Sequence, residues 1–357
     1  MKFGKSFEKS GKKLLRGIFR IFINSEEIDP AKVENNSINK VLIVRQDRRV
    51  GNLVLTTSLF ELTTLIFPKA KVDALVSNKL ISLIEDNKFI NRIIPFDHAG
   101  YIKNPFRFFS LIKTLRKNKY DLVVESSKPN GSSFLNGIIT YLCRAKFRVG
   151  FDKGDGSIFT NIHIKPDTSQ HYYKIQQQLL NIFSDSKIDV KPRLSVNEKE
   201  FNAYQLKLKQ KFSIINDKRI IGLWVGARGK KKWDLKYFMI LYERLIKNEN
   251  YFPVLCFGIE EKKYFDEKVL ENINKIFIDD LKELKLFISC CSCFICGDTG
   301  PLHFSFALNI PTIGIFFQDN YQTYGYSDKE NNHIIKPAEP EKMIEEIINS
   351  VEKILTK

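Results

Sequence analysis

The chain lacks the features that mark several large classes of protein. No uninterrupted apolar run reaches the roughly 18 residues that a membrane-spanning helix needs, so we expect no transmembrane segment. The N-terminus is basic, but arginines break its apolar run and no small-residue cleavage site follows, so we expect no secretory signal. A P-loop and a G-x-G-x-x-G fingerprint are also absent, as are recognisable nucleic-acid motifs. Any phosphate or nucleotide site must therefore use another pattern.

Cysteine is sparse, with six residues in 357, but four of them fall within SCCSCFICGD: Cys290, Cys291, Cys293 and Cys296. A structural metal site takes ligand pairs from separate elements, and the sequence has no second Cys/His cluster. We therefore expect no metal and no other cofactor. The stretch is better explained as a helix end that runs into a buried strand, where a free thiol behaves as a small apolar side chain.

Positive charge is abundant. The chain carries 57 basic and 41 acidic residues, a net charge of +16, which suits nucleic acid, anionic lipid or a phosphorylated small molecule. Near the N-terminus, apolar residues recur at helical spacing between basic ones (Leu14, Leu15, Ile18, Phe19, Ile21 and Phe22, with Lys12, Lys13, Arg16 and Arg20). This segment fits a membrane-surface helix, and equally a frayed tail or a helix packed on its own domain.

Strand-like and helix-like segments alternate twice along the chain, which predicts parallel sheets with helical crossovers. Continuous apolar runs, typical of strands buried on both faces, include KVLIV at 40–44, DLVVES at 121–126, IIGLWV at 220–225 and CFICG at 293–297. An irregular polar region spans about 153–200. We predict an α/β protein with two doubly wound domains facing a cleft. The expected boundaries are an N-terminal segment at 1–38, domains at 39–200 and 201–335, and a terminal helix at 336–357.

Ligands of such sheets bind beyond the carboxyl ends of the strands, and four strand ends carry unusual residues. RQDRRVGN follows the first strand and contains Arg45, Asp47, Arg48, Arg49, Gly51 and Asn52. GARGKKKWD begins with Gly226 and brings Lys230, Lys231 and Lys232 to one loop; lysine suits phosphate, although a solvated basic loop is the plain alternative. GIEEKK offers Glu260 and Glu261, which fit ribose hydroxyls or an exposed helix start equally well.

The fourth strand end, GDTGPLH, is the most informative. Thr299 suits a helix N-cap, and Pro301 falls in the first turn, where its missing N–H costs little. Free backbone N–H groups at Thr299 and Gly300 would then form an anion site at the helix start. Asp298 argues against a bare anion site and predicts a role in orienting the loop or ligand hydroxyls. His303 lies within reach of the same point, unless it faces the core. Together the loops predict a nucleotide-diphosphate site for group transfer from an activated donor.

In order and spacing, RQDRRVGNLVLTTSL, GARGKKKW and CGDTGPLHFSFALNIPTIGIF resemble the bacterial heptosyltransferases of lipopolysaccharide synthesis, glycosyltransferase family 9. The resemblance covers about residues 40–320. It implies a GT-B fold with two Rossmann-like domains, the acceptor in the first and the nucleotide sugar mainly in the second. It also implies metal-independent, inverting transfer of a heptose from an ADP-activated donor to a lipopolysaccharide inner-core acceptor.

The same resemblance implies residue roles. Lys232 would bind the donor phosphates, Thr299 and Gly300 the diphosphate, and Glu260 or Glu261 the ribose, with Gly226, Asp298 and His303 in the donor loops. On the acceptor side it implies Gly51, and we expect Arg45, Arg48 and Arg49 to face a polyanionic glycolipid through bidentate contacts.

One position departs from the family pattern. The family usually has Gly-Asp in the first loop, and that aspartate is its expected general base, whereas this chain has Gly51-Asn52. Asparagine does not usefully accept a proton. Either the nearest carboxylate, Asp47, acts as the base among arginines that keep it ionised, or the base role is relaxed and Asn52 only orients the acceptor.

The departure leaves other functions open. A catalytically weakened sugar-nucleotide-binding protein is one, and a family member using a different nucleotide sugar for another surface glycan is a second. Nucleic-acid binding has no motif in its favour. We expect the protein in the cytoplasm, with peripheral contact to the inner-membrane surface if the basic N-terminal segment binds lipid.

Overall fold

The computed structural model describes residues 23, 26–129, 133–152, 154–213, 218–328 and 330–356. The basic N-terminal segment, for which a membrane-surface helix, a frayed tail and a packed helix were all left open, lies outside these ranges. By its contacts the described chain divides into two compact units. The first comprises the residues up to Arg48, then Thr56–Ile81 and Lys88–Lys191; the second comprises Arg49–Leu55, Ser82–Asn87 and Pro192–Lys357.

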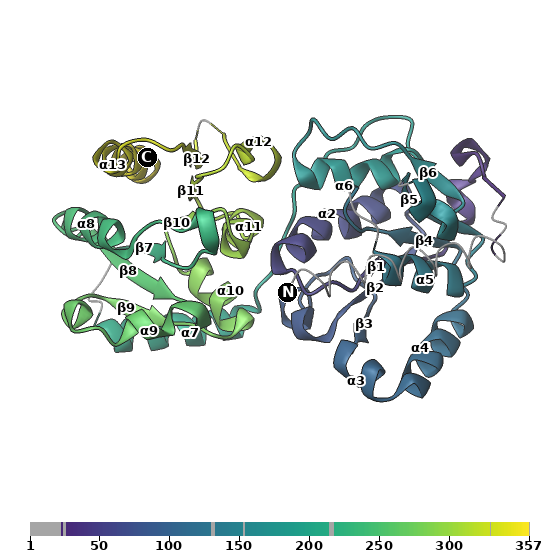
Figure 1. The fold of residues 1–357 in the computed structure, drawn as a ribbon, viewed down its shortest axis with the longest axis horizontal. Helices are drawn as coiled ribbons and strands as arrows, with labels where there is room; N and C mark the ends of the chain where they lie inside the picture. The colour runs from purple at the N-terminus through teal and green to yellow at the C-terminus, as the bar shows by residue number, and fades with distance from the viewer. Residues whose placement is uncertain are drawn as a thin grey trace, which may run out of the picture. The chain divides into compact units, whose positions relative to one another are not determined.

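The first unit is built on a parallel sheet of six strands in the order β3-β2-β1-β4-β5-β6 (Figure 1). The strands are β1 (Lys40–Arg45), β2 (Lys71–Ser77), β3 (Arg92–Phe96), β4 (Leu122–Glu125), β5 (Phe147–Phe151) and β6 (Ile162–Ile164). After its first residue, β1 is buried throughout. Its side chains alternate between two covered faces, which explains why the sequence of this strand is a continuous apolar run.

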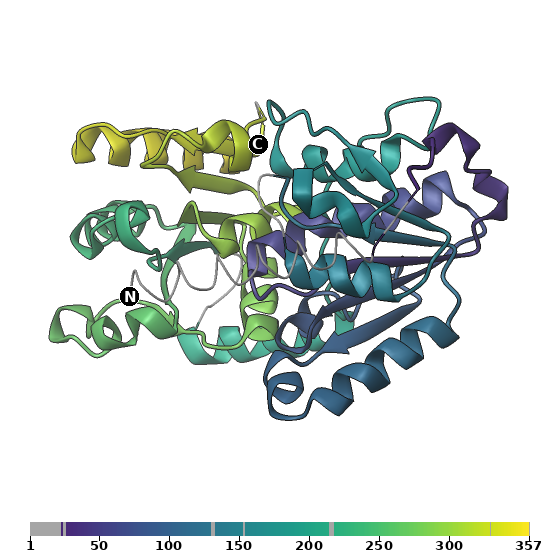
Figure 2. The same cartoon turned by 45° about the vertical axis from the view of Figure 1, so that its right-hand side comes forward.

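Helices cover both faces of this sheet. They are α2 (Val50–Ile66), α3 (His98–Lys103), α4 (Pro105–Lys117), α5 (Phe134–Leu142) and α6 (Tyr172–Asn181). The start of α2, up to Leu55, belongs to the second unit by its contacts. The inner faces of α4 and α5 pack on Leu42 and Val44 of β1 in one buried cluster. Figures 1 and 2 show α2 and α6 on the opposite side of the sheet. The start of α4 follows the sequence signal, because the side chain of Asn104 accepts a hydrogen bond from the Phe106 N–H at 3.1 Å and Pro105 fills the first turn.

The second unit repeats the arrangement, with a parallel sheet in the order β12-β11-β10-β7-β8-β9. Its strands are β7 (Arg219–Trp224), β8 (Tyr251–Phe257), β9 (Lys275–Phe277), β10 (Cys293–Gly297), β11 (Thr312–Ile315) and β12 (Asn332–Ile335). Renumbered from its own first strand, this sheet has the same order as the first. Both sheets are therefore doubly wound. The first three strands are added in one direction across the sheet and the last three in the other, so the order reverses between the first and fourth strands.

The helices of the second unit are α7 (Glu198–Phe212), α8 (Leu235–Leu245), α9 (Lys262–Phe265), α10 (Leu281–Ser289), α11 (Gly300–Ala307), α12 (Tyr321–Tyr324) and α13 (Pro340–Leu355). Apolar residues of α8 and α13 share one buried cluster with β7 and β10. The terminal helix α13 buries a stripe at helical spacing that includes Met343, Ile347 and Val351.

The predicted fold class, two doubly wound parallel sheets, is confirmed. The cysteine-rich stretch also folds as expected: α10 ends at Ser289, and Cys293 and Cys296 lie buried in β10. Within the polar region at 153–200, the structure has elements that were not predicted, β6 and α6. It also has β5, α7 and β12, which were missed. Within the described residues, no helix combines the length and the apolar character that crossing a bilayer requires.

Close packing at Gly222 in β7 generates a prediction about stability. A Cβ atom there would lie 2.6 Å from Cδ2 of Phe294 and 3.0 Å from Sγ of Cys291, both in the buried core. We expect Gly222→Ala to lower the free energy of unfolding by about 1–3 kcal/mol, the usual cost of overpacking. Denaturant unfolding measures it. The double variant Gly222→Ala/Phe294→Leu should recover part of the loss; a Gly222→Ala protein as stable as the wild type would contradict the packing.

Candidate active site

The strand order points to one place in each unit where a ligand binds. In a doubly wound sheet, the loops after the two central strands diverge and leave a crevice at their carboxyl ends. In the first unit these loops follow β1 and β4, and in the second they follow β7 and β10. Three of the four strand ends predicted to matter, RQDRRVGN, GARGKKKWD and GDTGPLH, fall at these two points.

In the second unit an ion pair joins the two loops. Nζ of Lys231, after β7, lies 2.5 Å from Oδ2 of Asp298, after β10. The amide of Asn320 donates to the same carboxylate oxygen at 2.7 Å. Asp298 is buried, so these two donors compensate a charge that would otherwise be costly away from water. Its carboxylate therefore links the loops after β7 and β10 and the segment that carries Asn320.

Sequence reasoning missed Lys231 and Asn320 as members of this cluster. Three consecutive lysines gave no signal to separate the one that pairs with Asp298. Asn320 follows the carboxyl end of β11, so the rule that located the other loops applied to it too. Lys230 and Lys232 are both exposed. Lys232 donates from Nζ to the Tyr264 hydroxyl at 3.1 Å.

The helix α11 begins directly after Asp298. Thr299 is its N-cap residue by position, but its side chain makes no cap hydrogen bond and instead donates to the Gly297 carbonyl at 3.3 Å. Gly300 and Pro301 form the first turn. Thr299 does not cap the helix start with its side chain, so the positive end of α11 and its first backbone N–H groups suit an anion.

His303, one turn further along α11, is buried at 6% exposure. The Tyr326 hydroxyl lies 2.8 Å from its Nδ1. Burial lowers the pKa of His303 to about 4; the charge of Asp298 raises it and that of Lys231 lowers it further. Gly51, which belongs to the same unit by its contacts, faces this ring: a Cβ there would lie 2.6 Å from its Cδ2. Only glycine fits without moving the imidazole.

The two candidate carboxylates after β8 have different surroundings. Arg228 donates from Nε to both carboxylate oxygens of Glu260 at 2.8 and 2.9 Å, and these hydrogen bonds lower the pKa of Glu260. Glu261 is buried, and desolvation together with the charge of Glu260 raises its pKa. It lies against the loop after β7, because a Cβ on Gly226 would come within 2.9 Å of its Oε2.

In the first unit the side chain of Arg45 joins the ends of β1 and β4. Its Nε lies 2.8 Å from Oδ2 of Asp47, and its Nη1 donates to the Ser126 carbonyl. Its Nη2 lies 3.5 Å from the Tyr172 hydroxyl on α6. Burial alone lowers the pKa of Arg45, but Tyr172, Asp47 and Glu125 together raise it above its ordinary value.

This geometry corrects the expectation for Arg45. The side chain is 1% exposed, and all of these partners belong to its own unit, so it does not face an acceptor. Arg45 instead orients Asp47. Arg48 and Arg49 are exposed, as acceptor contacts require. Asp47 is 29% exposed, whereas Asn52, in the first turn of α2, is only 8% exposed.

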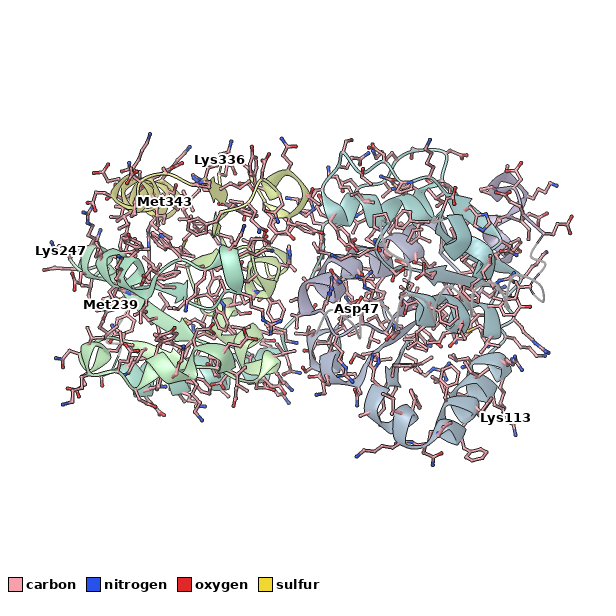
Figure 3. The ribbon with its side chains drawn as sticks, viewed as in Figure 1. Asp47, Lys113, Met239, Lys247, Lys336 and Met343 are labelled. Carbon is pink, nitrogen blue, oxygen red and sulfur yellow. The ribbon has the colours of Figure 1, made fainter. Side chains whose placement is uncertain are left out.

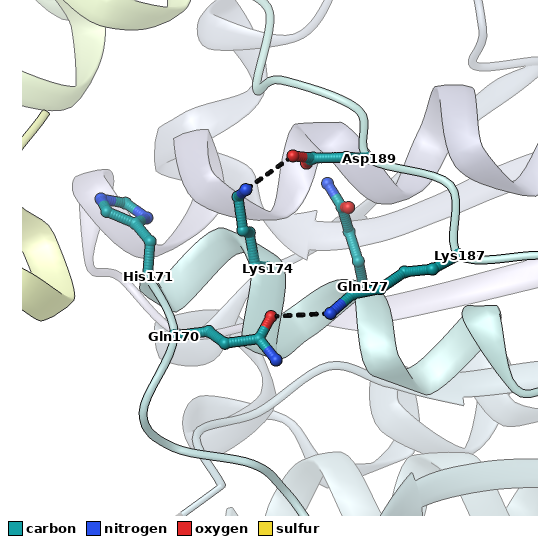
Figure 4. A pocket seen from close by; sticks show the side chains of 6 residues that line it. All are labelled: Gln170, His171, Lys174, Gln177, Lys187 and Asp189. Atoms are coloured by element: carbon teal, nitrogen blue, oxygen red, sulfur yellow. Dashed lines mark hydrogen bonds and ion pairs between the residues drawn. The ribbon is translucent and has the colours of Figure 1, made fainter. Parts of the chain in front are cut away.

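A pocket of ≈ 600 Å³ opens beside α6 in the first unit (Figure 4). Its lining residues are Gln170, His171, Lys174, Gln177, Lys187 and Asp189. Lys174 pairs with Asp189 at 2.7 Å, and Lys187 donates to the side-chain carbonyl of Gln170 at 3.2 Å. Two ammonium groups beside amides and a carboxylate suit a ligand that combines negative charge with hydroxyl groups. In the described part of the chain, no three or more His, Cys, Asp or Glu side chains are grouped to hold a metal ion.

Comparisons with known proteins show the family of the chain. The model of glycosyltransferase family 9 (heptosyltransferase) matches residues 108–353. Lipooligosaccharide heptosyltransferase 2 of Haemophilus ducreyi is 24% identical over 292 residues, which cover 76% of this chain and 81% of that protein.

Two solved structures are similar in fold. A family 9 glycosyltransferase from Veillonella parvula superposes with a TM-score of 0.76 at 16% identity and covers 93% of this chain and 99% of its own. The E. coli heptosyltransferase WaaC with ADP gives a TM-score of 0.67 at 16% identity and covers 88% and 99%. At these identities the likeness concerns the fold, and it confirms the expected GT-B architecture.

The burial of His303 predicts a pH dependence of stability. Its pKa is about 4 in the folded chain and about 6.5 when unfolded. The unfolded state therefore binds the extra proton between these values, and stability falls as the pH falls from about 6.5 to 4. At roughly 1.4 kcal/mol per pKa unit, the loss reaches about 3 kcal/mol.

Denaturant unfolding at a series of pH values measures this loss. We expect His303→Phe to flatten the slope over that range, whereas Tyr326→Phe, which leaves the imidazole in place, should keep it. Equal slopes in His303→Phe and the wild type would show that the imidazole is not buried in its neutral form.

Proposed function

Because this chain belongs to glycosyltransferase family 9, the heptosyltransferases, we propose that it transfers a heptose from an ADP-activated donor to an inner-core acceptor of lipopolysaccharide. The transfer proposed is metal-independent and inverts the anomeric centre. One observation carries the donor side of this proposal. The β7–β10 switch point combines a buried, paired Asp298 with an uncapped start of α11 and a lysine-rich loop.

In this proposal the donor diphosphate lies at the start of α11. The backbone of Thr299 and Gly300 and the positive end of the helix receive its oxygens. Lys232 supplies a positive charge from the neighbouring loop, and its ammonium donates to the Tyr264 hydroxyl at 3.1 Å. Asp298 contributes no charge to the phosphates, since Lys231 and Asn320 occupy its carboxylate. Its part is to hold the two loops together.

For the ribose hydroxyls we propose Glu261 in place of Glu260. The carboxylate of Glu260 is already engaged by Arg228. Glu261 lies against Gly226, in the loop after β7 that also carries the lysines. A carboxylate at the end of a strand accepts hydrogen bonds from two neighbouring hydroxyls, as in other doubly wound nucleotide sites.

On the acceptor side we propose the exposed arginines Arg48 and Arg49 together with the pocket beside α6. Both suit phosphate and carboxylate groups of an anionic glycolipid. Such an acceptor is anchored in a bilayer, so we propose peripheral attachment of the protein to the cytoplasmic face of the inner membrane. The net charge of +16 supports contact with an anionic surface.

Asp47 is the proposed general base. Inverting transfer needs the acceptor hydroxyl to lose its proton as it attacks the anomeric carbon. Asp47 is the partly exposed carboxylate of the first loop, and Arg45 holds its orientation. Asn52 then acts as a hydrogen-bonding residue that orients the acceptor hydroxyl. The relaxed-base alternative, a weakened sugar-nucleotide-binding protein, rests on the same asparagine and predicts donor binding without turnover.

Calorimetric titration with ADP, UDP, GDP and CDP in the presence of a chelator tests the donor site. We expect selective binding of ADP without metal. Lys232→Met should weaken ADP binding at least about tenfold, because one charge-assisted phosphate contact is lost, while adenosine binding should change little.

Lys230→Met is the matched control, since it removes a neighbouring exposed lysine of the same loop, and it should leave ADP affinity within about twofold. Preference for another nucleotide would indicate a donor activated by that nucleotide in place of ADP. Binding of none of the four would overturn the proposed activity.

Substitution of the proposed base separates the two roles in the first loop. Asp47→Asn should lower kcat by about a hundredfold or more, the usual contribution of a general base, with ADP affinity unchanged. Asn52→Ala should mainly raise the KM for the acceptor. Steady-state release of ADP in the presence of donor and acceptor measures both. Normal turnover of Asp47→Asn would rule out Asp47 as the general base. Recovery of turnover in Asp47→Asn/Asn52→Asp would show that a carboxylate at either position can act as the base.

A further inference from the structure

The helices α3 and α4 of the first unit expose large apolar side chains that do not pack into the core. Ile102 is 82% exposed, Phe106 81% and Phe109 65%. Ile102 and Phe106 are the two most exposed large hydrophobic side chains in the described part of the chain. Both views of the ribbon show α3 and α4 at the outside of their unit (Figures 1 and 2). Single exposed apolar residues are ordinary, whereas a cluster of them marks an interaction surface.

The opposite side of α4 packs against the core of the first unit. Leu111, Ile112 and Leu115 are buried and join the cluster beneath the sheet. Phe106 and Phe109 are three residues apart and lie on the outward side of the helix, which Lys113 and Lys117 continue at the next two turns. The helix therefore has an inner apolar stripe that packs and an outer one that meets solvent.

The charged side chains of residues 98–120, which include this outer stripe, are all basic. Residues 98–120 contain six basic residues and no acidic residue: Lys103, Arg107, Lys113, Arg116, Lys117 and Lys119. Arg116 donates to a backbone carbonyl, and Arg107 lies 3.3 Å from Asp97. The four lysines are exposed, and Figure 3 shows Lys113 projecting outward from α4.

We propose that the α3–α4 surface (Ile102, Lys103, Phe106, Phe109, Lys113 and Lys117) docks the protein on an anionic lipid bilayer. Aromatic and aliphatic side chains on a short helix face, ringed by lysines, match the boundary between acyl chains and anionic headgroups. A protein partner would need its own acidic surface around an apolar pocket, whereas a bilayer of anionic lipid supplies both at any point. The inference rests on the proposed glycolipid acceptor for its purpose, but its test uses vesicles without any acceptor.

The lysines draw the surface toward the membrane, and each contributes about a fivefold gain in affinity near anionic headgroups. The apolar side chains then enter the interface, and the loss of one phenylalanine is worth at least about tenfold. The attraction of the lysines is electrostatic, so salt weakens it. The contribution of the apolar side chains is hydrophobic, so salt does not weaken it. Docking here places the first unit, which carries Asp47 and the proposed acceptor residue Arg48, at the membrane surface.

A fluorescent residue reports contact at this surface alone. Both native tryptophans, Trp224 and Trp233, are buried, so Phe109→Trp adds an exposed indole. Vesicles of phosphatidylethanolamine and phosphatidylglycerol, with bromine on the acyl chains, should shift its emission to the blue and quench it. Ile259→Trp, at a position 70% exposed on the second unit, is the matched control and should not respond. Phosphatidylcholine vesicles should give little effect in either variant.

Two outcomes of this experiment would overturn the proposal. An indole in Phe109→Trp that responds to vesicles no more than Ile259→Trp would leave the surface for a protein partner. An indole already shielded before vesicles are added would show that the chain itself or a second copy covers the surface. Neither outcome bears on ADP binding or turnover, so the proposed activity stands or falls separately.

Vesicle flotation of charge and apolar variants gives the second measurement. Phe106→Ser/Phe109→Ser should weaken binding to the anionic vesicles at least about tenfold, and Lys113→Glu/Lys117→Glu by a similar factor at low salt. Leu206→Ser/Val269→Ser, which removes two exposed apolar side chains of the second unit, should change nothing. Turnover with a soluble acceptor fragment should be normal in all three. Unchanged flotation of both α3–α4 variants would refute the docking surface.

Discussion

Each unit depends on a positively charged side chain that bridges its two central strands. The bridge lies where the order of the strands in the sheet reverses. In a doubly wound sheet, the loops that follow the two central strands diverge. They leave a crevice at the carboxyl ends of these strands. In the first unit Arg45 spans that gap, from the end of β1 to the Ser126 carbonyl after β4. In the second, Lys231 spans it from the loop after β7 to Asp298 after β10. These two bridges fix Asp47 in the first unit and Asp298, directly before α11, in the second.

Burial makes the bridges specific. A buried guanidinium or carboxylate without its partner costs several kcal/mol, so the paired arrangement excludes alternatives. Arg45 can be stable at 1% exposure because Asp47, the Ser126 carbonyl and Tyr172 surround its guanidinium. The pairing with Asp47 fixes a carboxylate directly after β1. Asp298 is held in the same way by Lys231 and Asn320, and the start of α11 directly behind it is thereby fixed. The same constraint fixes a carboxylate in one unit and, in the other, the helix start for which we propose anion binding.

The central strands could be predicted from the sequence because burial on both faces makes them continuous apolar runs. β5 and β6 were harder. β6 has only three residues at the edge of its sheet, and β5 carries an arginine within the run FRVGF. The loops at the strand ends were found because strand direction alone determines where they meet. What the sequence could not separate were neighbours of the same type. Arg45 differs from Arg48 only through Ser126 and Tyr172, and Lys231 differs from Lys232 only through Asp298, all distant in sequence.

The bridge at Arg45 also bears on how a carboxylate beside a cation can serve as a base. A neighbouring guanidinium fixes the direction in which the carboxylate oxygens point, as Arg45 does for Asp47 at 2.8 Å. Glycosyl transfer proceeds through a transition state with oxocarbenium character, as in glycoside hydrolysis, where bond breaking at the sugar runs ahead of bond making. The acceptor hydroxyl becomes acidic only as it joins the anomeric carbon, so its proton leaves late and a weak base suffices. Orientation then matters more than basicity, and orientation is what Arg45 supplies. An amide at position 52 is tolerable under these conditions, because the loop keeps a fixed carboxylate five residues earlier.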